Sequence, residues 1–246
     1  MDLKGIKILT AALVIFLSQG AMATTVSLDD ELECMLEPNS EIEISAAVPG
    51  LLSEVLVQRG DRVEKGQVLA RLISGPERAA VELAKARVEF GKRKAVRNED
   101  LYKKKVISIH DKDEMDTEVL IARLQLKQAQ EQLKLREITS PINGVVVERE
   151  KDSGEYVETE PLLTIVNLDP LNVEVVAPAE LYGTIEKGMH AKVTTVGRSS
   201  GTYDAKVTLI DQVIDAASGT IRIRLVLPNP DNIIPAGLTC YVKFKT

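Results

Sequence analysis

The chain has 246 residues, a net charge of -6 and an apolar fraction of 44%, values that suit one large or two small folded domains. It contains no Trp and only three Phe. Because nucleic-acid-binding proteins need a basic face and stack bases on aromatic side chains, we exclude nucleic acid as a partner.

Residues 1–23 have the three-part plan of a secretory signal peptide. Two lysines precede the apolar run 8–17, and an Ala-Met-Ala triplet ends at Ala23. An uncleaved membrane anchor is the alternative, but the run is far shorter than the ~20 residues that span a bilayer. We therefore expect cleavage after Ala23 and a mature chain that is exported and soluble.

The only two cysteines are Cys34 and Cys240, near the ends of the mature chain. In an oxidising compartment such a pair is a candidate disulfide, here between the first and last predicted strands. Two buried free thiols are the alternative. Residues 31–45 are predicted to form half-buried strands from the apolar alternation of Leu32, Cys34 and Leu36 with Ile42 and Ile44, interrupted by a Pro38-Asn39 turn.

Residues 44–72 and 138–166 are two copies of one small unit, aligned without a gap. Apolar runs broken by glycines at fixed places are typical of short strands and tight turns. We therefore expect one β-domain built from two halves. The identical positions are Ile44/Ile138, Gly50/Gly144, Glu54/Glu148, Gly60/Gly154, Val63/Val157, Glu64/Glu158 and Leu69/Leu163.

The segment between the copies, residues 75–137, is predicted to be an antiparallel helical hairpin. Its return helix, 111–137, has a seven-residue apolar repeat typical of a coiled coil: Met115, Val119, Ala122, Leu126, Ala129 and Leu133. The outgoing helix, 77–105, has a weaker repeat that we expect to face it: Leu83, Ala86, Phe90, Arg97 and Leu101. At the turn, Ser108 and Asp111 fit a capping box.

Residues 168–246 contain several short predicted strands separated by Gly-, Pro- and Asn-rich turns, a pattern that indicates a small β-barrel. A short helix is expected near 178–185. The predicted fold is thus mainly β with a long α-helical hairpin. Its expected parts are a signal peptide (1–23), an N-terminal strand segment packing on the barrel (24–43), lipoyl-like half 1 (44–74), the coiled-coil hairpin (75–137), lipoyl-like half 2 (138–167) and the β-barrel (168–246).

No catalytic, cofactor or metal site is predicted. His110 and His190 have no other His or Cys at ligand spacing, so a zinc site is not supported. No nucleophile elbow or phosphate loop is present. Acidic residues cluster at repeat-related turns and are more simply solvated turn positions than acid-base pairs: Asp61, Glu64, Glu155 and Glu158.

The chain resembles the periplasmic adaptor subunits, or HlyD-like membrane fusion proteins, of tripartite efflux pumps, most of all those of resistance-nodulation-division (RND) pumps. The segments that carry the resemblance are 48–70, similar to the lipoyl-type signature, 138–146, similar to its partner half, and the barrel segment 215–225 with Asn229-Pro230 and 236–238. Their order around a helical hairpin is specific. The resemblance implies a barrel-sandwich hybrid domain interrupted by the hairpin.

The resemblance also implies a non-catalytic adaptor in the periplasm. Its partners would be an inner-membrane transporter of RND or ABC type and a TolC-type outer-membrane channel, with self-association into a funnel of three to six copies. Family members that dock on such channels carry Arg, Leu and Ser near the hairpin tip, and Arg97, Leu101 and Ser108 have that spacing. The alternative is that Arg97 is solvated, Leu101 is core and Ser108 is only a cap.

Two further features bear on the resemblance. Many members have another membrane-proximal β-domain after the barrel, and this sequence ends at Thr246, so we expect a reduced adaptor. Lipoyl and biotinyl carriers share the half-repeat but acylate a Lys where the halves join. Here Arg78 stands near that place, and a guanidinium is not acylated as an amine is, so a carrier role is disfavoured.

Overall fold

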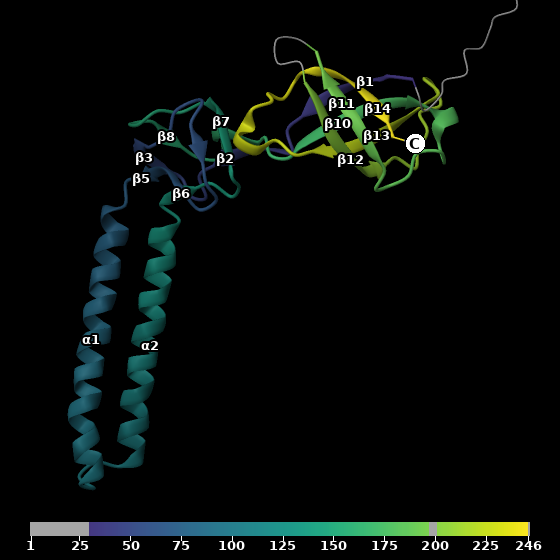
Figure 1. Ribbon diagram of the computed structural model, residues 1–246. Helices are drawn as coiled ribbons and strands as arrows, with labels where there is room; N and C mark the ends of the chain where they lie inside the picture. Colours follow the sequence, from purple (N-terminus) through teal and green to yellow (C-terminus); the bar gives the residue numbers. More distant parts are fainter. Residues whose placement is uncertain (1–29, 197–200, 246) are drawn as a thin grey trace, which may run out of the picture.

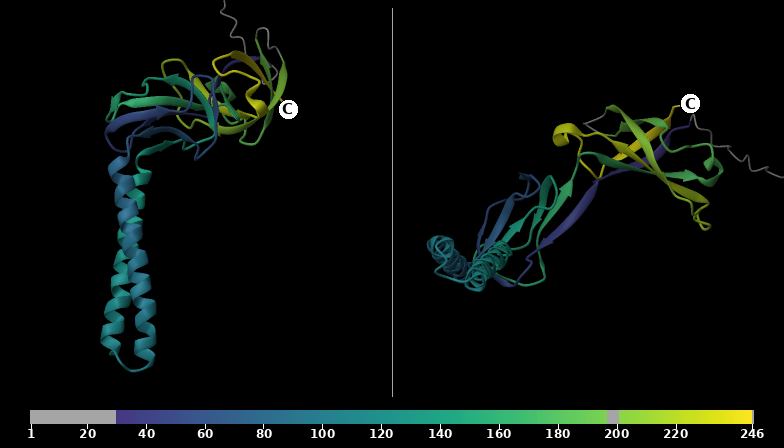
Figure 2. Two further views of the ribbon diagram at one scale, coloured as in Figure 1. Left: turned by 90° about the vertical axis from the view of Figure 1, so that its left-hand side faces the viewer. Right: turned by 90° about the horizontal axis from the view of Figure 1, so that it is seen from below.

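The computed structural model describes residues 30–196 and 201–245, and the predicted signal peptide lies outside them. Figure 1 shows three parts: a helical hairpin, a β-sandwich from which the hairpin projects, and a β-barrel on the far side of the sandwich. The predicted fold class is confirmed. Among the residues that the structure describes, the hairpin is the long extension, and its tip lies far from both β-domains (Figure 2).

The sandwich consists of two four-stranded sheets that mix strands from both halves of the repeat. One sheet has the order β2 (Ser40–Ser45), β9 (Pro161–Asn167), β7 (Gly144–Arg149) and β4 (Arg62–Val63). The other has the order β6 (Glu137–Thr139), β5 (Val68–Leu72), β3 (Gly50–Val55) and β8 (Tyr156–Val157). Each half contributes one short strand to the sheet of the other half. Strand β4 of the first half pairs with β7 of the second, and strand β8 of the second half pairs with β3 of the first.

The two repeat-related turns explain why glycine recurs at the same place in each copy. Gly60 and Gly154 have φ angles of 95° and 92°, a region that residues with a Cβ rarely adopt. The apolar positions of both halves then meet in one core. The repeat in the sequence is therefore a repeat in the structure, with strands β3, β4 and β5 equivalent to β7, β8 and β9.

The N-terminal segment divides between two domains, which corrects the expected boundary at residue 43. Strand β1 (Leu32–Glu37) belongs to the barrel as predicted, but β2 pairs with β9 in the sandwich. The backbone N–H of Asn39 donates to the Asn167 carbonyl at 2.9 Å, so the sandwich ladder begins directly after Pro38. The domain boundary therefore lies at the Pro38-Asn39 turn.

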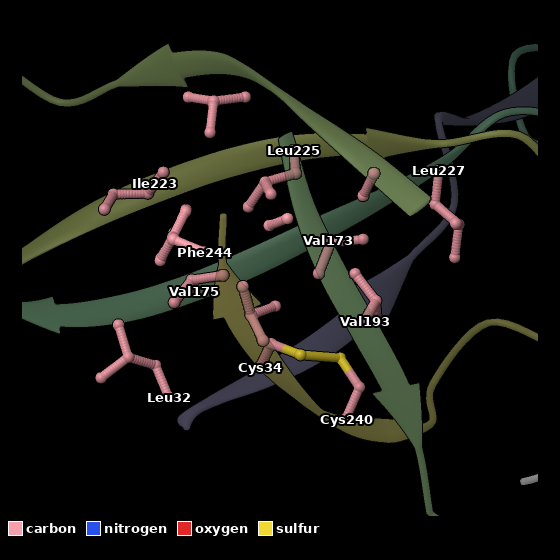
Figure 3. Packing of buried hydrophobic residues seen from close by; sticks show 14 of the residues in the cluster. Leu32, Cys34, Val173, Val175, Val193, Ile223, Leu225, Leu227, Cys240 and Phe244 are labelled. Atoms are coloured by element: carbon pink, nitrogen blue, oxygen red, sulfur yellow. A yellow bond between two sulfur atoms is a disulfide. The ribbon is translucent and has the colours of Figure 1, made fainter. Parts of the chain in front are cut away.

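The barrel is closed by its first and last strands. Its order is β1, β10 (Leu171–Pro178), β13 (Thr220–Leu227), β12 (Thr202–Ile210), β11 (His190–Thr195) and β14 (Thr239–Phe244), and β14 pairs back to β1. Alternate residues of these strands fill the interior (Figure 3). The short helix expected near 178–185 is only a 3-10 turn, Ala179–Leu181; a second such turn is Pro230–Asn232.

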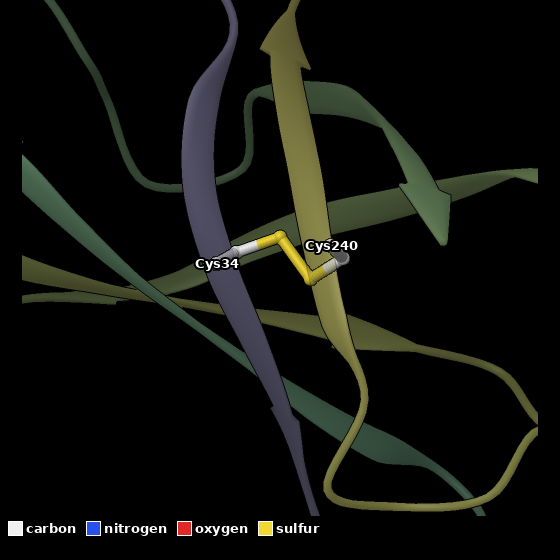
Figure 4. Close-up of a disulfide and its surroundings, with 2 residues drawn as sticks. All are labelled: Cys34 and Cys240. Atoms are coloured by element: carbon white, nitrogen blue, oxygen red, sulfur yellow. A yellow bond between two sulfur atoms is a disulfide. The ribbon is translucent and has the colours of Figure 1, made fainter. Parts of the chain in front are cut away.

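Cys34 and Cys240 lie directly opposite each other on β1 and β14 and form a disulfide with an S–S distance of 2.05 Å (Figure 4). Both residues are buried, with exposed fractions of 4% and 0%. The bond therefore joins the two strands at which the barrel closes.

The hairpin consists of α1 (Gly75–Lys103) and α2 (Ile109–Lys134). The predicted seam of α2 is confirmed, because all six of its positions are buried or half-buried. The predicted seam of α1 is wrong. Val81, Ala84 and Val88 are the buried residues of α1, whereas Leu83 and Phe90 are 55% and 59% exposed.

The position of Gly91 shows why α1 pairs through this other face. A Cβ at Gly91 would lie 3.2 Å from Cγ2 of Val119 on α2. The seam of α1 thus consists of small residues that allow close helix approach, and the larger side chains remain on the outside.

An ion pair holds the base of the hairpin against the sandwich. Arg136, just after α2, donates from Nε and Nη2 to Oε1 of Glu77 at 3.0 and 2.7 Å and from Nη1 to the Pro49 carbonyl at 3.0 Å. A Cβ at Gly50 would come within 2.9 Å of that guanidinium. Because Arg136 directly follows α2, its contacts to Glu77 on α1 and to Pro49 just before β3 restrict the angle at which the hairpin leaves the domain.

Candidate functional site

The candidate site is the hairpin tip, where the chain reverses between Lys104 and Ser108. The N–H of Lys104 donates to the Asp100 carbonyl at 3.1 Å, and that of Val106 donates to the Leu101 carbonyl at 2.9 Å. Lys105 has a φ of 58°, the left-handed conformation in which many helices end. These bonds end α1 and direct the chain to the start of α2.

Ser108 begins α2 with the predicted capping box, which is confirmed. Its Oγ accepts from the N–H of Asp111 at 3.2 Å, and its own N–H donates to Oδ2 of Asp111 at 3.0 Å. The Ser108 hydroxyl also donates to Oδ2 at 2.7 Å. This hydroxyl and the Ser108 N–H together lower the pKa of Asp111 below its usual range.

Arg97 and Leu101 are both exposed and lie one helical turn apart on α1. Leu101 is 37% exposed, so it is not a core residue of the hairpin. Arg97 makes no ion pair within residues 30–196 and 201–245. A free cation and an apolar side chain therefore stand side by side on one helix face.

Lys112 braces the tip from α2. Its Nζ lies 2.9 Å from Asp116 and 3.9 Å from Glu99 on α1, and 5.8 Å from the centre of the Tyr102 ring. The hydrogen bond to Asp116 is the main reason why the pKa of Lys112 is raised. These contacts tie the two helix ends together, so the tip has a defined shape.

Two exposed apolar residues at the tip were missed by the sequence reasoning. Val106 and Ile109 are 66% and 57% exposed and flank Ser108 on either side. The sequence contained a signal for them. Apolar side chains beside a capping residue in a polar turn have no helix to pack on, so they are expected to be exposed. Together with Leu101, they make the end of the hairpin more apolar than a solvated turn requires.

Two kinds of feature are absent from the described parts of the chain. Across residues 30–196 and 201–245, no group of three or more His, Cys, Asp or Glu side chains is placed to hold a metal ion. Among the same residues, no helix is both long and apolar enough to cross a bilayer. The distinctive feature of the described residues is the hairpin, whose tip exposes Leu101, Val106 and Ile109.

Replacing Ser108 with Ala is expected to destabilise the hairpin by about 1 kcal/mol, because an N–H of the first turn loses its acceptor. Ser108→Asn, which keeps a capping oxygen, should retain most of the stability. Thermal unfolding followed by helical circular dichroism measures both variants. Equal melting temperatures for Ser108→Ala and the unchanged protein would contradict a capping role.

The same cap predicts a pH dependence. The pKa of Asp111 is lower in the folded than in the unfolded protein. The contribution of this carboxylate to folding stability is therefore fully present above the unfolded pKa and is lost as the pH falls through the folded pKa. The difference in stability between Ser108→Ala and the unchanged protein should therefore be constant near neutral pH and should shrink below about pH 4.

Family models match nearly all of the described chain. The model for the CzcB-like barrel-sandwich hybrid domain matches residues 40–167, and the model for the CusB-like β-barrel domain matches residues 171–246. Their limits agree with the sandwich and barrel described above, and the first begins at β2.

Curated relatives are linker proteins of efflux systems. The antibiotic efflux pump periplasmic linker protein ArpA of Pseudomonas putida is 25% identical over 219 residues, covering 82% of this chain and 59% of ArpA. The multidrug resistance protein MdtA of Xenorhabdus bovienii is 28% identical, covering 78% of this chain and 52% of MdtA. The chain thus spans less than two thirds of the length of these relatives.

Solved structures share the fold. A MacA-MexA chimera with the α-hairpin domain of Pseudomonas aeruginosa MexA has a TM-score of 0.73 at 20% identity, covering 88% of this chain and 80% of the chimera. The membrane fusion protein Spr0693 of Streptococcus pneumoniae has a TM-score of 0.67 at 19% identity, covering 88% of this chain and 99% of the Spr0693 chain. The chain therefore belongs to the membrane fusion protein family of efflux-pump periplasmic adaptors, with a CzcB-like barrel-sandwich hybrid domain followed by a CusB-like β-barrel.

Proposed function

We propose that this chain is a non-catalytic periplasmic adaptor that links an inner-membrane RND transporter to a TolC-type outer-membrane channel for the efflux of small molecules. The observation that carries the proposal is the exposure of Arg97, Leu101 and Ser108 at the end of a braced helical arm. The names of its relatives, periplasmic linkers of antibiotic and multidrug efflux pumps, support the same role.

The shape of the molecule suits a connector. Helix α1 has 29 residues and so reaches about 40 Å from the sandwich, and the barrel extends sideways from the other end of the sandwich, so that the molecule is L-shaped (Figure 1). The hairpin tip would contact the channel, and the barrel would contact the transporter. A guanidinium at the tip would donate hydrogen bonds to carboxylate or carbonyl groups of a partner helix, and Leu101 would fill an apolar gap beside them.

Assembly and location complete the proposal. Export with removal of residues 1–23 would bring the chain to the periplasm, where the Cys34–Cys240 disulfide forms under oxidising conditions. Several copies, three to six, would surround the transport path and form a funnel. Association with the inner membrane would come through the transporter.

The test is cross-linking in living cells, followed by purification of the adaptor and mass spectrometry. We expect an RND transporter and an outer-membrane channel in the purified complex. Recovery of an ABC exporter instead would change the transporter class, and absence of any inner-membrane transporter would contradict the adaptor role. The variant Arg97→Asp/Leu101→Asp should lose the channel and keep the transporter, whereas Lys92→Asp/Val96→Asp, which changes the charge equally at the same spacing, should keep both.

A further inference from the structure

A small pocket lies at the base of the hairpin, where the two helices meet strands β5 and β6 (Figure 1). Its volume is about 320 Å³, which is enough for a small molecule. Three arginines from different parts of the chain line it: Arg71 on β5, Arg78 on α1 and Arg136 just after α2. The other lining residues are Leu72, Ser74, Leu133 and Glu137. The lining is therefore rich in hydrogen-bond donors and contains one carboxylate.

Two of the three arginines are explained by the groups that they bind. Arg71 donates from Nη1 to Glu54 at 2.6 Å and from Nε to Glu137 at 3.3 Å. Arg136 donates to Glu77 and to one backbone carbonyl. Glu54 and Glu77 do not line the pocket. Since a guanidinium carries more N–H groups than these bonds use, both arginines still have donors for a ligand.

Arg78 has no such explanation. It makes no ion pair among residues 30–196 and 201–245, and it is the fourth residue of a helix of 29 residues. The N-terminal end of a helix has a partial positive charge and unbonded N–H groups, so a cation there is unfavourable and an anion is favourable. The one acid of this first turn, Glu77, is held by Arg136. An anion in the pocket would therefore stabilise an arrangement that is otherwise unfavourable.

Ser74, the residue before α1, adds a buried polar group to the pocket. It is 7% exposed, yet its side chain makes no capping hydrogen bond and bonds nothing else in the part of the chain that the structure describes. Ser108 at the start of α2, by contrast, caps its helix in the ordinary way. A buried hydroxyl without a partner costs free energy, and a ligand in this pocket would supply the partner.

We propose that this pocket binds a phosphate group. Guanidinium groups, a helix N-terminus and a serine hydroxyl are donors that proteins place around phosphate, whereas a carboxylate needs only one bidentate arginine. Leu72 and Leu133 make part of the wall apolar, so the phosphate can belong to a small ester or be free. A bound phosphate would bridge β5, α1 and the segment after α2, and so would stiffen the joint between hairpin and sandwich. This inference does not rest on the adaptor role, whose candidate site is at the other end of the hairpin.

The test is calorimetric titration and thermal unfolding of the purified mature protein with inorganic phosphate, at an ionic strength kept constant with chloride. We expect saturable binding and a melting temperature that rises with phosphate, because a ligand that binds only the folded state stabilises it. Arg78→Gln should weaken phosphate binding about tenfold or more, as expected for the loss of a charge-assisted contact. In chloride alone it should melt no lower than the unchanged protein, since it removes a cation from a helix N-terminus.

Arg87→Gln is the matched control. Arg87 is exposed on the same helix, more than two turns from Arg78, does not line the pocket and makes no ion pair within the described ranges, 30–196 and 201–245. This variant should bind phosphate as the unchanged protein does. Arg78→Lys, which keeps the charge but loses the planar fork, should bind with intermediate affinity. Equal melting temperatures in phosphate and in chloride, or equal binding by Arg78→Gln and Arg87→Gln, would overturn the proposal.

The choice of phosphate and the source of the group are tested with other ligands. Acetate should bind about tenfold more weakly than phosphate, and acetate binding of equal strength would overturn the choice of phosphate. Tighter binding of glycerol 3-phosphate than of inorganic phosphate would assign the site to a phosphate ester that also contacts Leu72 and Leu133, and equal binding would assign it to free phosphate.

Ser74→Ala tests the buried hydroxyl. It should weaken phosphate binding severalfold and leave the helical circular dichroism unchanged, because this hydroxyl does not cap α1. Unchanged phosphate affinity would contradict its place in the site. All these measurements use purified protein, so their failure would reject the phosphate site and leave the adaptor role in place.

Discussion

Replacing Cys34 and Cys240 with Ala is expected to lower the free energy of unfolding of the barrel by about 5 kcal/mol. The two residues are 206 positions apart, and cross-linking so long a loop removes a large part of the conformational entropy of the unfolded chain. The bond also joins β1 to β14, the pair of strands at which the barrel closes. Without the disulfide, only the hydrogen bonds and packing of the six-residue strand β1 close the barrel, and the chain that follows β1 belongs to the sandwich.

Urea denaturation with and without a reductant measures this effect. The unchanged protein in reductant should unfold at nearly the same urea concentration as the double Ala variant, because both lack the cross-link. The urea midpoint of the double Ala variant should not change with reductant. The effect of reductant on the unchanged protein therefore measures loss of the bond alone, without loss of side-chain volume. A shift below about 1 kcal/mol, or alkylation of both thiols in unreduced protein, would contradict a stabilising disulfide.

The sandwich could be predicted because the sequence contains two copies of the same glycine and apolar pattern. Gly60 and Gly154 mark the same turn with positive φ, and the apolar positions between them repeat in step. What the sequence did not reveal was the partner of strand β2, which pairs with β9 more than a hundred residues later. Its residues alternate as barrel strands also do, so only the partner strand decides to which domain it belongs.

The helix faces were predicted unequally for a physical reason. In α2 the inner seam keeps an unbroken seven-residue repeat from Met115 to Leu133, so the pattern identifies it although Leu120, Ile121 and Leu124 are exposed on the outside. In α1 the larger side chains Leu83 and Phe90 lie outside, and the inner seam contains Ala84 and Gly91. Close approach of two backbones favours small residues, which a search for large apolar residues does not detect.

The error on α1 changes the interpretation of the candidate site. Arg97 and Leu101 were assigned both to the inner seam and to docking, and these roles exclude each other. The structure removes them from the seam and leaves them exposed. Val106 and Ile109 were not predicted because single apolar residues in a short turn form no repeat.

The variant Arg97→Asp/Leu101→Asp is expected to abolish efflux while the protein stays folded and exported. Arg97 makes no ion pair among the described residues and Leu101 is 37% exposed, so the hairpin should remain folded. At a partner surface, however, a donor becomes an acceptor and an apolar contact becomes a charge that must be desolvated. If each change costs about 2 kcal/mol at a docking hot spot, the affinity for the channel falls roughly a thousandfold.

Drug susceptibility of cells that depend on this adaptor measures efflux, and circular dichroism of the purified variant measures folding. Lys92→Asp/Val96→Asp is the control, since it places the same charges at the same spacing on another side of α1, where Val96 is 71% exposed and Lys92 pairs only with Glu89 of the same helix. Full efflux in the control and none in the test variant would assign docking to the face of Arg97 and Leu101. Unchanged efflux in the test variant would remove that assignment, and equal loss in both would mean that the effect of the added negative charge is not specific to the face of Arg97 and Leu101.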